Sequence, residues 1–341
     1  MQQFLNLQQL PQALADRKVM LVCGGSLDRL SIGSSVKKLA AVRFSDFSPN
    51  PLYEDVAAGV KLFLETGCNA ILAVGGGSAM DVAKCIKLFA TMDHGRLYLG
   101  QPYEENDIPL AAIPTTAGTG SESTRHAVIY YKGEKQSISH PSLVPGFVCL
   151  IPEVLDGLPV YQKKCTMLDA LGQAIESWWS VSARLESIEY SRKAIGLIKE
   201  YWKPYIENGG YAEEILLASN YAGRAINITA TTAAHAMSYK LTSLYGIPHG
   251  HAVGLCLPEV WAEMADDEKL QDTFRAFPVD LPWLCDLLNQ LGMEKPVSSN
   301  RDTDLEILAD SVNPLRLKNN PVAFSRDTLK AMYERILSNE S

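Results

Sequence analysis

Three of the six histidines in the chain lie within the segment 235–251, which reads HAMSYKLTSLYGIPHGH. Imidazole is the commonest neutral metal ligand, and two imidazoles together with a carboxylate suit zinc or ferrous iron. Residues 234–243 are predicted to be helical, and the glycines and proline at 246–250 interrupt the chain before a second apolar run. We therefore expect His235 and His249 to lie on successive helices and to bind one ion. The alternative is that they are core or capping histidines.

A second segment, MLDALGQAIE at 167–176, offers an acidic ligand and a fourth donor at helical spacing. Asp169 and Gln173 are four residues apart, so both project from one face of a helix. An unpaired carboxylate is costly to bury in such an apolar stretch, and a bound cation would remove that cost. The predicted metal ligands are therefore Asp169, Gln173, His235 and His249. The alternative is that Asp169 interacts with the helix dipole or with a surface cation.

Glycine turns follow two predicted strands in the first half of the chain. Strand 18–23 leads into GGS at 24–26, and strand 70–74 leads into GGGS at 75–78. A junction of this kind lets backbone N–H groups at a helix start approach a phosphate. The spacing departs from the G-x-G-x-x-G dinucleotide pattern, so a tight turn without a ligand is the alternative.

A polar loop, PTTAGTGSE at 114–122, follows the next predicted strand. Its hydroxyls and glycine amides suit a ribose, a phosphate or a nicotinamide carboxamide. The loop and the two glycine turns together predict a dinucleotide site. The predicted cofactor-binding residues are Gly24, Gly25, Ser26, Gly76, Gly77, Ser78, Asp81, Thr115, Thr116, Thr119 and Ser121.

Strands and helices alternate in the first half of the chain, which predicts a doubly wound parallel sheet with helices on both faces. Strands are expected at 18–23, 42–44, 70–74 and 110–113, with a hairpin at 128–131 and 136–139. After Pro152 only helices are expected, at roughly 163–182, 186–207, 211–229, 231–245, 250–264, 280–292, 303–313 and 325–338. We therefore predict an α/β dinucleotide-binding domain over residues 1–155 and an all-helical metal and substrate domain over residues 156–341.

The composition limits the class of protein. With 47% hydrophobic and 21% charged residues among 341, the chain has the values of a soluble globular protein. The net charge of −8 argues against a nucleic-acid or anionic membrane surface. No secretion signal or membrane span is evident, so a cytoplasmic location is expected. The seven cysteines include no CxxC pair, which favours buried reduced thiols over ligands or disulfides.

Four motifs in matching order resemble the iron-containing (group III) alcohol dehydrogenases, relatives of glycerol dehydrogenase and dehydroquinate synthase. They are GGGSAMDVAK at 75–84, the loop at 114–122, the helix of Asp169, and the pair His235 and His249. The resemblance runs along nearly the whole chain. It implies a nucleotide domain, an all-helical metal domain and an active site in the cleft between them.

Three positions depart from the usual pattern of that family. Gln173 stands where a histidine ligand is usual, although relatives with one acid and two histidines imply that the site can survive the change. Tyr239 replaces another common histidine, and is either a proton relay or, as we favour, a residue that lines the pocket. The first glycine turn, at 24–26, lacks the acid with which NAD-preferring members hold the ribose, so NADPH is the preferred cofactor and NADH the alternative.

The resemblance implies that a bound Fe²⁺ or Zn²⁺ polarises an aldehyde while the nicotinamide delivers hydride. Water, Tyr239 or His251 would complete the proton relay. The region from His235 onward resembles the phosphonoacetaldehyde reductases of phosphonate biosynthesis, for which Arg125 and Lys240 are the candidate substrate-binding cations. The alternatives are reduction of an uncharged aldehyde, a diol dehydrogenase, and a metal-free nucleotide-binding relative. Family members often form dimers, so a homo-oligomer is expected.

Overall fold

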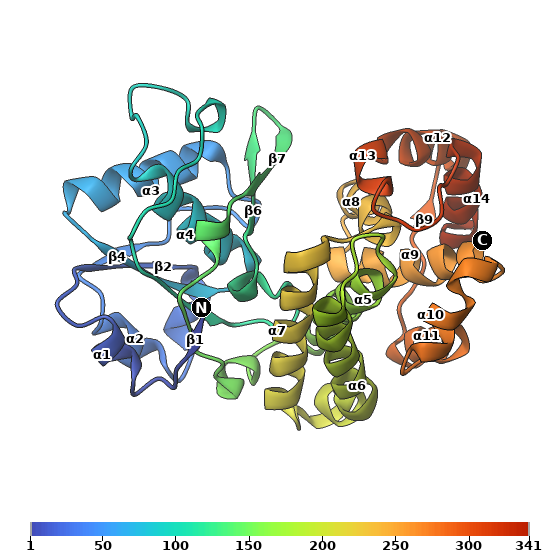
Figure 1. Ribbon diagram of the computed structural model, residues 1–341, viewed down its shortest axis with the longest axis horizontal. Coiled ribbons are helices and arrows are strands. Elements are labelled where there is room, and N and C mark those ends of the chain that lie inside the picture. Colours follow the sequence, from blue (N-terminus) through green and yellow to red (C-terminus); the bar gives the residue numbers. More distant parts are fainter. Residues whose placement is uncertain (1, 340–341) are drawn as a thin grey trace. The chain divides into compact units, whose positions relative to one another are not determined.

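The structure is a computed structural model that describes residues 2–339. It divides into two units, Met1–Leu158 and Pro159–Ser341. The first unit contains a parallel sheet with helices, and the second consists almost entirely of helices (Figure 1).

Six parallel strands form the sheet of the first unit, in the order β1-β8-β5-β4-β2-β3. The strands are β1 (Gln3–Phe4), β2 (Val19–Cys23), β3 (Val42–Phe44), β4 (Ala70–Gly75), β5 (Leu110–Pro114) and β8 (Phe147–Val148). Every residue of β2, β4 and β5 is buried, which explains why their sequences are continuous apolar runs. The predicted α/β class is confirmed. The two-residue strands β1 and β8 were not predicted, because they are too short to show a recognisable pattern of apolar residues.

Helices cover both faces of this sheet (Figure 1). In that view α3 (Tyr53–Glu65) and α4 (Gly77–Phe89) lie above the strands, while α1 (Leu10–Ala13) and α2 (Gly33–Lys37) lie below. The predicted hairpin, β6 (His126–Tyr131) with β7 (Glu134–Ser139), forms a separate antiparallel sheet. Short 3₁₀ turns complete the unit: η1 (Gly25–Arg29), η2 (Tyr98–Gly100), η3 (Ser121–Ser123), η4 (Pro141–Leu143) and η5 (Pro152–Leu155).

The second unit contains each of the eight helices expected from the sequence and two shorter ones, α10 and α13. The helices are α5 (Val160–Trp179), α6 (Leu185–Asn208), α7 (Ala212–Thr229), α8 (Ala233–Tyr245), α9 (His249–Met264), α10 (Gln271–Ala276), α11 (Leu281–Leu291), α12 (Arg301–Ser311), α13 (Pro314–Leu317) and α14 (Arg326–Ile336). A 3₁₀ turn, η6 (Glu268–Leu270), and a two-stranded pair, β9 (Val297–Ser298) with β10 (Ser338–Asn339), were not anticipated.

The central helix of this unit is α5, which contacts α6, α7 and α9. It is buried without interruption from Cys165 to Trp179, as expected for a helix that is apolar on all sides. Trp179 packs at its end against Trp261, at a ring-centroid distance of 5.7 Å. Polar side chains on such a helix need partners, and Asp169, Gln173 and Glu176 are all buried on it.

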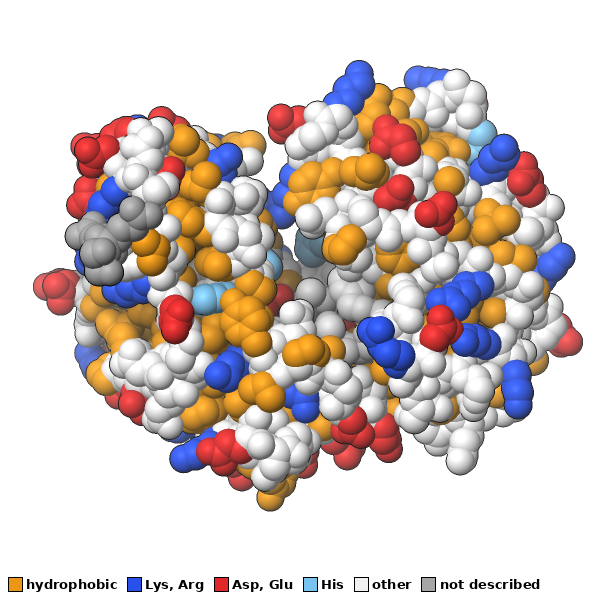
Figure 2. All heavy atoms as spheres, turned by 180° about the vertical axis from the view of Figure 1, so that it is seen from behind, with side chains coloured by type: hydrophobic (Ala, Val, Ile, Leu, Met, Phe, Trp, Pro, Cys, Tyr) orange, Lys and Arg blue, Asp and Glu red, His pale blue; other side chains and the backbone are white. Residues whose placement is uncertain are grey.

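The distribution of charged side chains and the burial of most cysteines agree with what the composition predicts. Acidic and basic side chains are interspersed on the face shown in Figure 2. None of the helices within residues 2–339 is long and apolar enough to cross a bilayer. All seven cysteines are free, and six are buried as predicted, but Cys285 is exposed because it lies on the outer face of α11.

Candidate metal centre and cofactor site

Three of the predicted ligands converge in the second unit. Asp169 on α5, His235 on α8 and His249 at the start of α9 each present one ligand atom, and these atoms lie within 4.8 Å of one another. The distance to Asp169 Oδ1 is 3.2 Å from Nε2 of His235 and 3.9 Å from Nε2 of His249. Asp169 and His235 are buried, whereas the His249 side chain is 36% exposed. The cluster is therefore open on the side of His249.

Glu176, which the sequence reasoning did not assign, fixes the orientation of His235. Its carboxylate accepts a hydrogen bond from Nδ1 of His235. It also accepts from the backbone N–H of Ala234 at 2.7 Å and from the hydroxyl of Thr232 at 2.7 Å. With Nδ1 held by Glu176, Nε2 faces Asp169: it donates to that carboxylate while the ring is protonated and can bind a metal ion once that proton is displaced. A signal was present in the sequence, because Glu176 is a lone acid in an apolar run, two helical turns after Asp169.

Ser238 has the corresponding role for His249. The Ser238 hydroxyl donates to the carbonyl of His235 at 2.8 Å, so its oxygen acts as an acceptor for Nδ1 of His249 at 3.3 Å. Both histidines therefore direct Nε2 toward Asp169. Outer hydrogen bonds of this kind are usual around metal-binding histidines.

Two glycines set the distance between the helices that carry the ligands. A β-carbon at Gly250 would lie 1.8 Å from the carbonyl oxygen of Cys165 and 3.0 Å from Cβ of Asp169. A β-carbon at Gly172 would lie 2.5 Å from Cγ1 of Val253. Backbone approach this close requires glycine, and it brings His249 within reach of Asp169.

The electrostatics of the cluster favour a cation. Burial raises the pKa of Asp169, but the hydrogen bond from His235 and the nearby His249 and His235 imidazoles together outweigh it and hold that pKa below its usual range. Burial also opposes protonation of His235, yet the Glu176 and Asp169 carboxylates raise its pKa to about 9. Two buried carboxylates therefore attract positive charge to one point. An aspartate and two imidazoles fit Zn²⁺ or Fe²⁺ and leave coordination positions for water or substrate.

Gln173, the fourth predicted ligand, lies on the same buried face of α5. Its amide hydrogen-bonds to the Asp169 carboxylate and contributes to the lowered pKa of that group. In the structure Gln173 therefore orients a ligand through its N–H donor.

Of the two predicted catalytic residues, Tyr239 contacts a predicted metal ligand and His251 does not. Tyr239 lies one turn after His235, and its ring is parallel to the His249 imidazole, with the centroids 5.4 Å apart. His251 is buried elsewhere: Nε2 donates to the carbonyl of Glu294 at 2.9 Å, and Nδ1 accepts from the hydroxyl of Tyr161 at 2.8 Å. Both nitrogens of His251 are occupied within the protein, so it has no part in the mechanism proposed below.

The two predicted substrate cations, Lys240 and Arg125, lie on different elements of the structure. Lys240 follows Tyr239 on α8, so its side chain leaves the helix about 100° away from that of Tyr239. Arg125 belongs to the first unit, where it follows η3. The cation beside Tyr239 is instead Arg316 on α13, whose Nη1 donates to the phenol oxygen at 3.1 Å. Sequence reasoning could not find Arg316, because 77 residues separate it from Tyr239.

The glycine turns of the first unit lie at the carboxyl edge of its sheet. Between β2 and β4 the strand order reverses direction, and ligands of open α/β sheets bind at such a point. The turn at 24–26 follows β2, and Gly76 precedes the first residue of α4. A β-carbon at Gly76 would lie 3.4 Å from Thr116, and one at Gly77 would lie 3.2 Å from Thr119. The predicted loop thus packs directly against the predicted phosphate turn.

Asp81 and Ser121, also predicted to bind the cofactor, belong to a buried network. Asp81 accepts from the Ser121 hydroxyl at 3.2 Å and from the N–H of Val128 at 3.0 Å. The ammonium of Lys84 donates to Ser121 at 2.9 Å and to the carbonyl of His126 at 2.8 Å. This network joins α4 to the loop and the hairpin. Ser78 donates to the carbonyl of Pro49.

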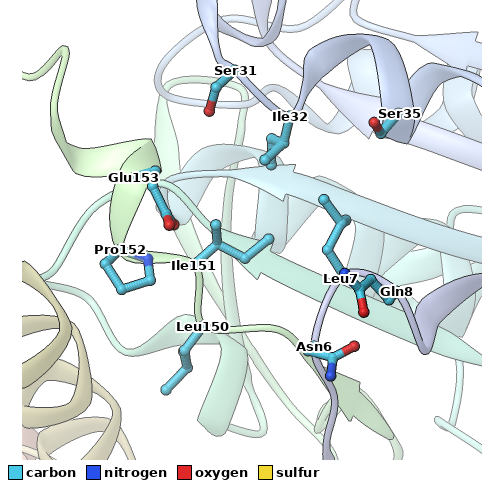
Figure 3. Close-up of a pocket in the computed structure, with 10 residues that line it drawn as sticks. All are labelled: Asn6, Leu7, Gln8, Ser31, Ile32, Ser35, Leu150, Ile151, Pro152 and Glu153. Atoms are coloured by element: carbon cyan, nitrogen blue, oxygen red, sulfur yellow. The ribbon is translucent and has the colours of Figure 1, made fainter.

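A hollow of about 500 Å³ opens at the same edge of the sheet (Figure 3). It is lined by the segment after β1, by the start of α2 and by the residues after β8. Figure 3 labels Leu7, Ile32 and Ile151 among its lining residues, together with Ser31 and Ser35. The lining is therefore partly apolar and partly polar.

Comparisons with known proteins agree with this geometry. The family model described as "Iron-containing alcohol dehydrogenase" matches residues 2–152, and its C-terminal counterpart, "Fe-containing alcohol dehydrogenase family, C-terminal", matches residues 164–337. The chain belongs to the iron-containing alcohol dehydrogenase family. The predicted family is thereby confirmed, and an iron-containing alcohol dehydrogenase is an oxidoreductase that uses NAD(P) and a divalent metal ion.

Several known dehydrogenases and reductases are similar to this chain over most of their length. The 4-hydroxybutyrate dehydrogenase of Clostridium kluyveri is 32% identical over 291 residues, which cover 79% of this chain and 78% of that protein. A sulfoacetaldehyde reductase from Bifidobacterium kashiwanohense, solved with NAD⁺, is 27% identical with a TM-score of 0.86, covering 98% of this chain and 96% of that one. A 1,3-propanediol oxidoreductase is 26% identical with a TM-score of 0.88, covering 98% and 97%.

Proposed function

We propose that this protein reduces a short aldehyde bearing an acidic group, with NADPH as the hydride donor and a divalent metal ion held by Asp169, His235 and His249. Phosphonoacetaldehyde is the substrate we favour, and 2-hydroxyethylphosphonate is then the product. The observation that carries the proposal is the convergence of the three ligand atoms within 4.8 Å, with both imidazoles oriented by hydrogen bonds.

When bound, the metal ion supplies Lewis-acid polarisation of a carbonyl oxygen, and the nicotinamide supplies hydride. The protein's contribution is to hold the metal ligands and to orient their side chains. Glu176 and Ser238 fix the ring nitrogens that face Asp169. Tyr239 stacks its ring against His249, where it would limit the access of water to the cluster, and its hydroxyl is held by Arg316.

The acidic substrate is supported by the similar proteins. The names of the 4-hydroxybutyrate dehydrogenase and the sulfoacetaldehyde reductase each specify a substrate with an anionic end group. A neutral substrate is the second candidate, since the 1,3-propanediol oxidoreductase is similar to the same extent.

The preference for NADPH is supported by two cations beside the first glycine turn. Arg43 donates to the carbonyl of Gly24 at 3.3 Å and to Asp28 at 3.1 Å, and Lys37 pairs with the same aspartate. Two cations share one acid, so the turn has an excess of positive charge that suits a 2′-phosphate. A β-carbon at Gly24 or Gly25 would meet no atom within 4 Å, which leaves room for the ribose.

A substrate panel tests the proposal. The purified protein would be reconstituted with Fe²⁺ or Zn²⁺ and assayed for oxidation of NADPH and NADH with phosphonoacetaldehyde and with propionaldehyde. We expect one bound metal ion per chain and the highest kcat/KM for phosphonoacetaldehyde with NADPH. Higher kcat/KM for propionaldehyde would overturn the acidic substrate. Absence of both bound metal and aldehyde reduction would instead identify a metal-free nucleotide-binding relative.

A further inference from the structure

Arg316 and Tyr239 form a stack next to the metal ligand His249. The Tyr239 ring is parallel to the imidazole of His249, with an interplanar angle of 4°. The guanidinium carbon of Arg316 lies 5.0 Å from the centroid of the same tyrosine ring, and Nη1 donates to its hydroxyl at 3.1 Å. The permanent positive charge of Arg316 therefore contacts the Tyr239 ring, which in turn stacks on the metal ligand His249.

The surrounding backbone holds Arg316 in this place. Its helix, α13, begins at a cap in which the Asn313 side chain accepts from the N–H of Leu315 at 2.8 Å. Just after the helix, the amide of Asn319 donates to the carbonyls of Thr229 and Thr231, at 2.8 Å and 3.0 Å. These two carbonyls immediately precede α8, the helix that carries His235 and Tyr239. These hydrogen bonds thereby connect the segment that follows Arg316 to the segment that precedes the helix of His235 and Tyr239.

We propose that Arg316 binds the anionic end group of the aldehyde and is the residue that selects an acidic substrate. The proposal rests on the proposed function, because it requires the aldehyde oxygen to lie at the metal-binding cluster. A planar guanidinium donates two parallel hydrogen bonds to a phosphonate, sulfonate or carboxylate. One or a few carbon atoms then connect the anionic group at Arg316 to the carbonyl group at the cluster.

Arg316 meets this requirement better than Lys240, one of the two cations expected from the sequence. Lys240 leaves α8 in a different direction from Tyr239, whereas Nη1 of Arg316 donates to the Tyr239 hydroxyl at 3.1 Å. Lysine would also offer only a point charge, whereas arginine offers a fork that matches the geometry of an oxyanion. The competing structural role for Arg316 is simply to brace Tyr239, and this role predicts a different pattern of kinetics.

The experiment compares Arg316→Met, Arg316→Lys and the nearby exposed Lys318→Met in the metal-loaded enzyme. Each is assayed with phosphonoacetaldehyde, succinic semialdehyde and neutral propionaldehyde, and binding of the product analogue ethylphosphonate is measured by calorimetry. For Arg316→Met we expect kcat/KM for both acidic aldehydes to fall roughly 10- to 100-fold relative to propionaldehyde, mainly through KM, with a parallel loss of ethylphosphonate affinity. Arg316→Lys is expected to recover part of the loss, and Lys318→Met to resemble the wild type.

The possible failures are distinguishable. An equal loss for the acidic and the neutral aldehydes in Arg316→Met, with ethylphosphonate affinity retained, would show that Arg316 only braces Tyr239 and would overturn this inference. A wild-type enzyme that reduces only propionaldehyde would overturn it as well, while leaving a metal-dependent reductase in place. A wild-type protein that reduces none of the three aldehydes would overturn the proposed function itself.

Discussion

The Glu176 carboxylate holds the Nδ1–H of His235, and through it directs Nε2 of that ring toward Asp169. Glu176 is fully buried, so this pairing is not weakened by solvent. The same carboxylate accepts from the N–H groups of Ala234 and His235. Glu176 thus positions a metal ligand without being one.

Replacement of Glu176 with glutamine should weaken metal binding. The amide preserves the shape of the side chain but removes the charge that orients the imidazole, and such outer partners are typically worth 10- to 100-fold in affinity. The loss would be measured by competition with a chelator. The exposed Glu213→Gln on α7 is the control, and unchanged metal affinity in Glu176→Gln would contradict the assigned role.

Gly250→Ala should disrupt both the metal site and the fold of the second unit. The new methyl group would collide with the Cys165 carbonyl, and overpacking of this kind typically costs about 1–3 kcal/mol or more in the free energy of unfolding. Thermal unfolding and metal content would be measured together. The control is Gly196→Ala in α6, where no atom obstructs a β-carbon and a stabilisation of roughly 0.5–1 kcal/mol is expected. Equal effects of the two changes would refute the role of close backbone approach.

Lys84→Met should remove the main positive charge near the half-buried Asp81, with which Lys84 shares the Ser121 hydroxyl. Removing one of two opposite charges in a buried network typically costs up to about 3–5 kcal/mol. Replacing both residues, as Asp81→Asn with Lys84→Met, should cost less than the single change, because no isolated charge remains. Urea denaturation at pH 7, below the lowered Lys84 pKa of about 8, would measure these losses, with the exposed Lys61→Met expected within about 0.5 kcal/mol of wild type.

The Lys84 substitution should also have a characteristic pH dependence. Burial raises the pKa of Asp81 to about 6 even with Lys84 present, and the pKa in the unfolded chain is 3.8. The folded state therefore retains the Asp81 proton between these values, and the contribution of Asp81 to stability grows as pH falls through that window. Without Lys84 the pKa of folded Asp81 should rise above 6, so the Lys84→Met protein should be less impaired at pH 5.5 than at pH 7, where the wild-type Lys84 is still charged. A loss that grows on acidification would contradict this.

Arg43→Met should reduce the preference for NADPH. Arg43 lies against the Gly24 carbonyl, and loss of a charge-assisted contact to the 2′-phosphate is expected to raise the Kd for NADPH roughly 10- to 100-fold. The Kd for NADH should change much less, which fluorescence titration of both nucleotides would reveal. The exposed Lys38→Met is the matched control. Equal weakening of both nucleotides would assign Arg43 a structural role only.

The secondary-structure elements could be predicted from the sequence, because their signals are local. The fold class was predicted from two signals: the apolar runs of β2, β4 and β5, and the helical periodicity of apolar residues in α5 to α9. Asp169, His235 and His249 stood out by residue type and spacing. Arg316 could not be found in this way, since it lies on a four-residue helix that meets Tyr239 only through tertiary packing.

The hydrogen-bond partners of individual side chains were the feature least predictable from the sequence. His251 is two residues after His249, yet the helical rotation turns it toward Tyr161 and Glu294. Asp81 and Ser121 were expected near a cofactor, but each hydrogen-bonds within the buried network of Lys84. Residue type alone does not distinguish a group that faces a ligand from one that satisfies a buried partner.

The contact of Gly250 with the Cys165 carbonyl has a consequence for the choice of ion. Where two helices meet main chain to main chain, no flexible side chain is available to adjust the gap between them. The separation of Asp169 and His249 is thus established when the helices pack, before any ion arrives. Any adjustment to a larger cation would therefore have to come from rotation of the ligand side chains, because the spacing of their backbones belongs to the folded scaffold itself.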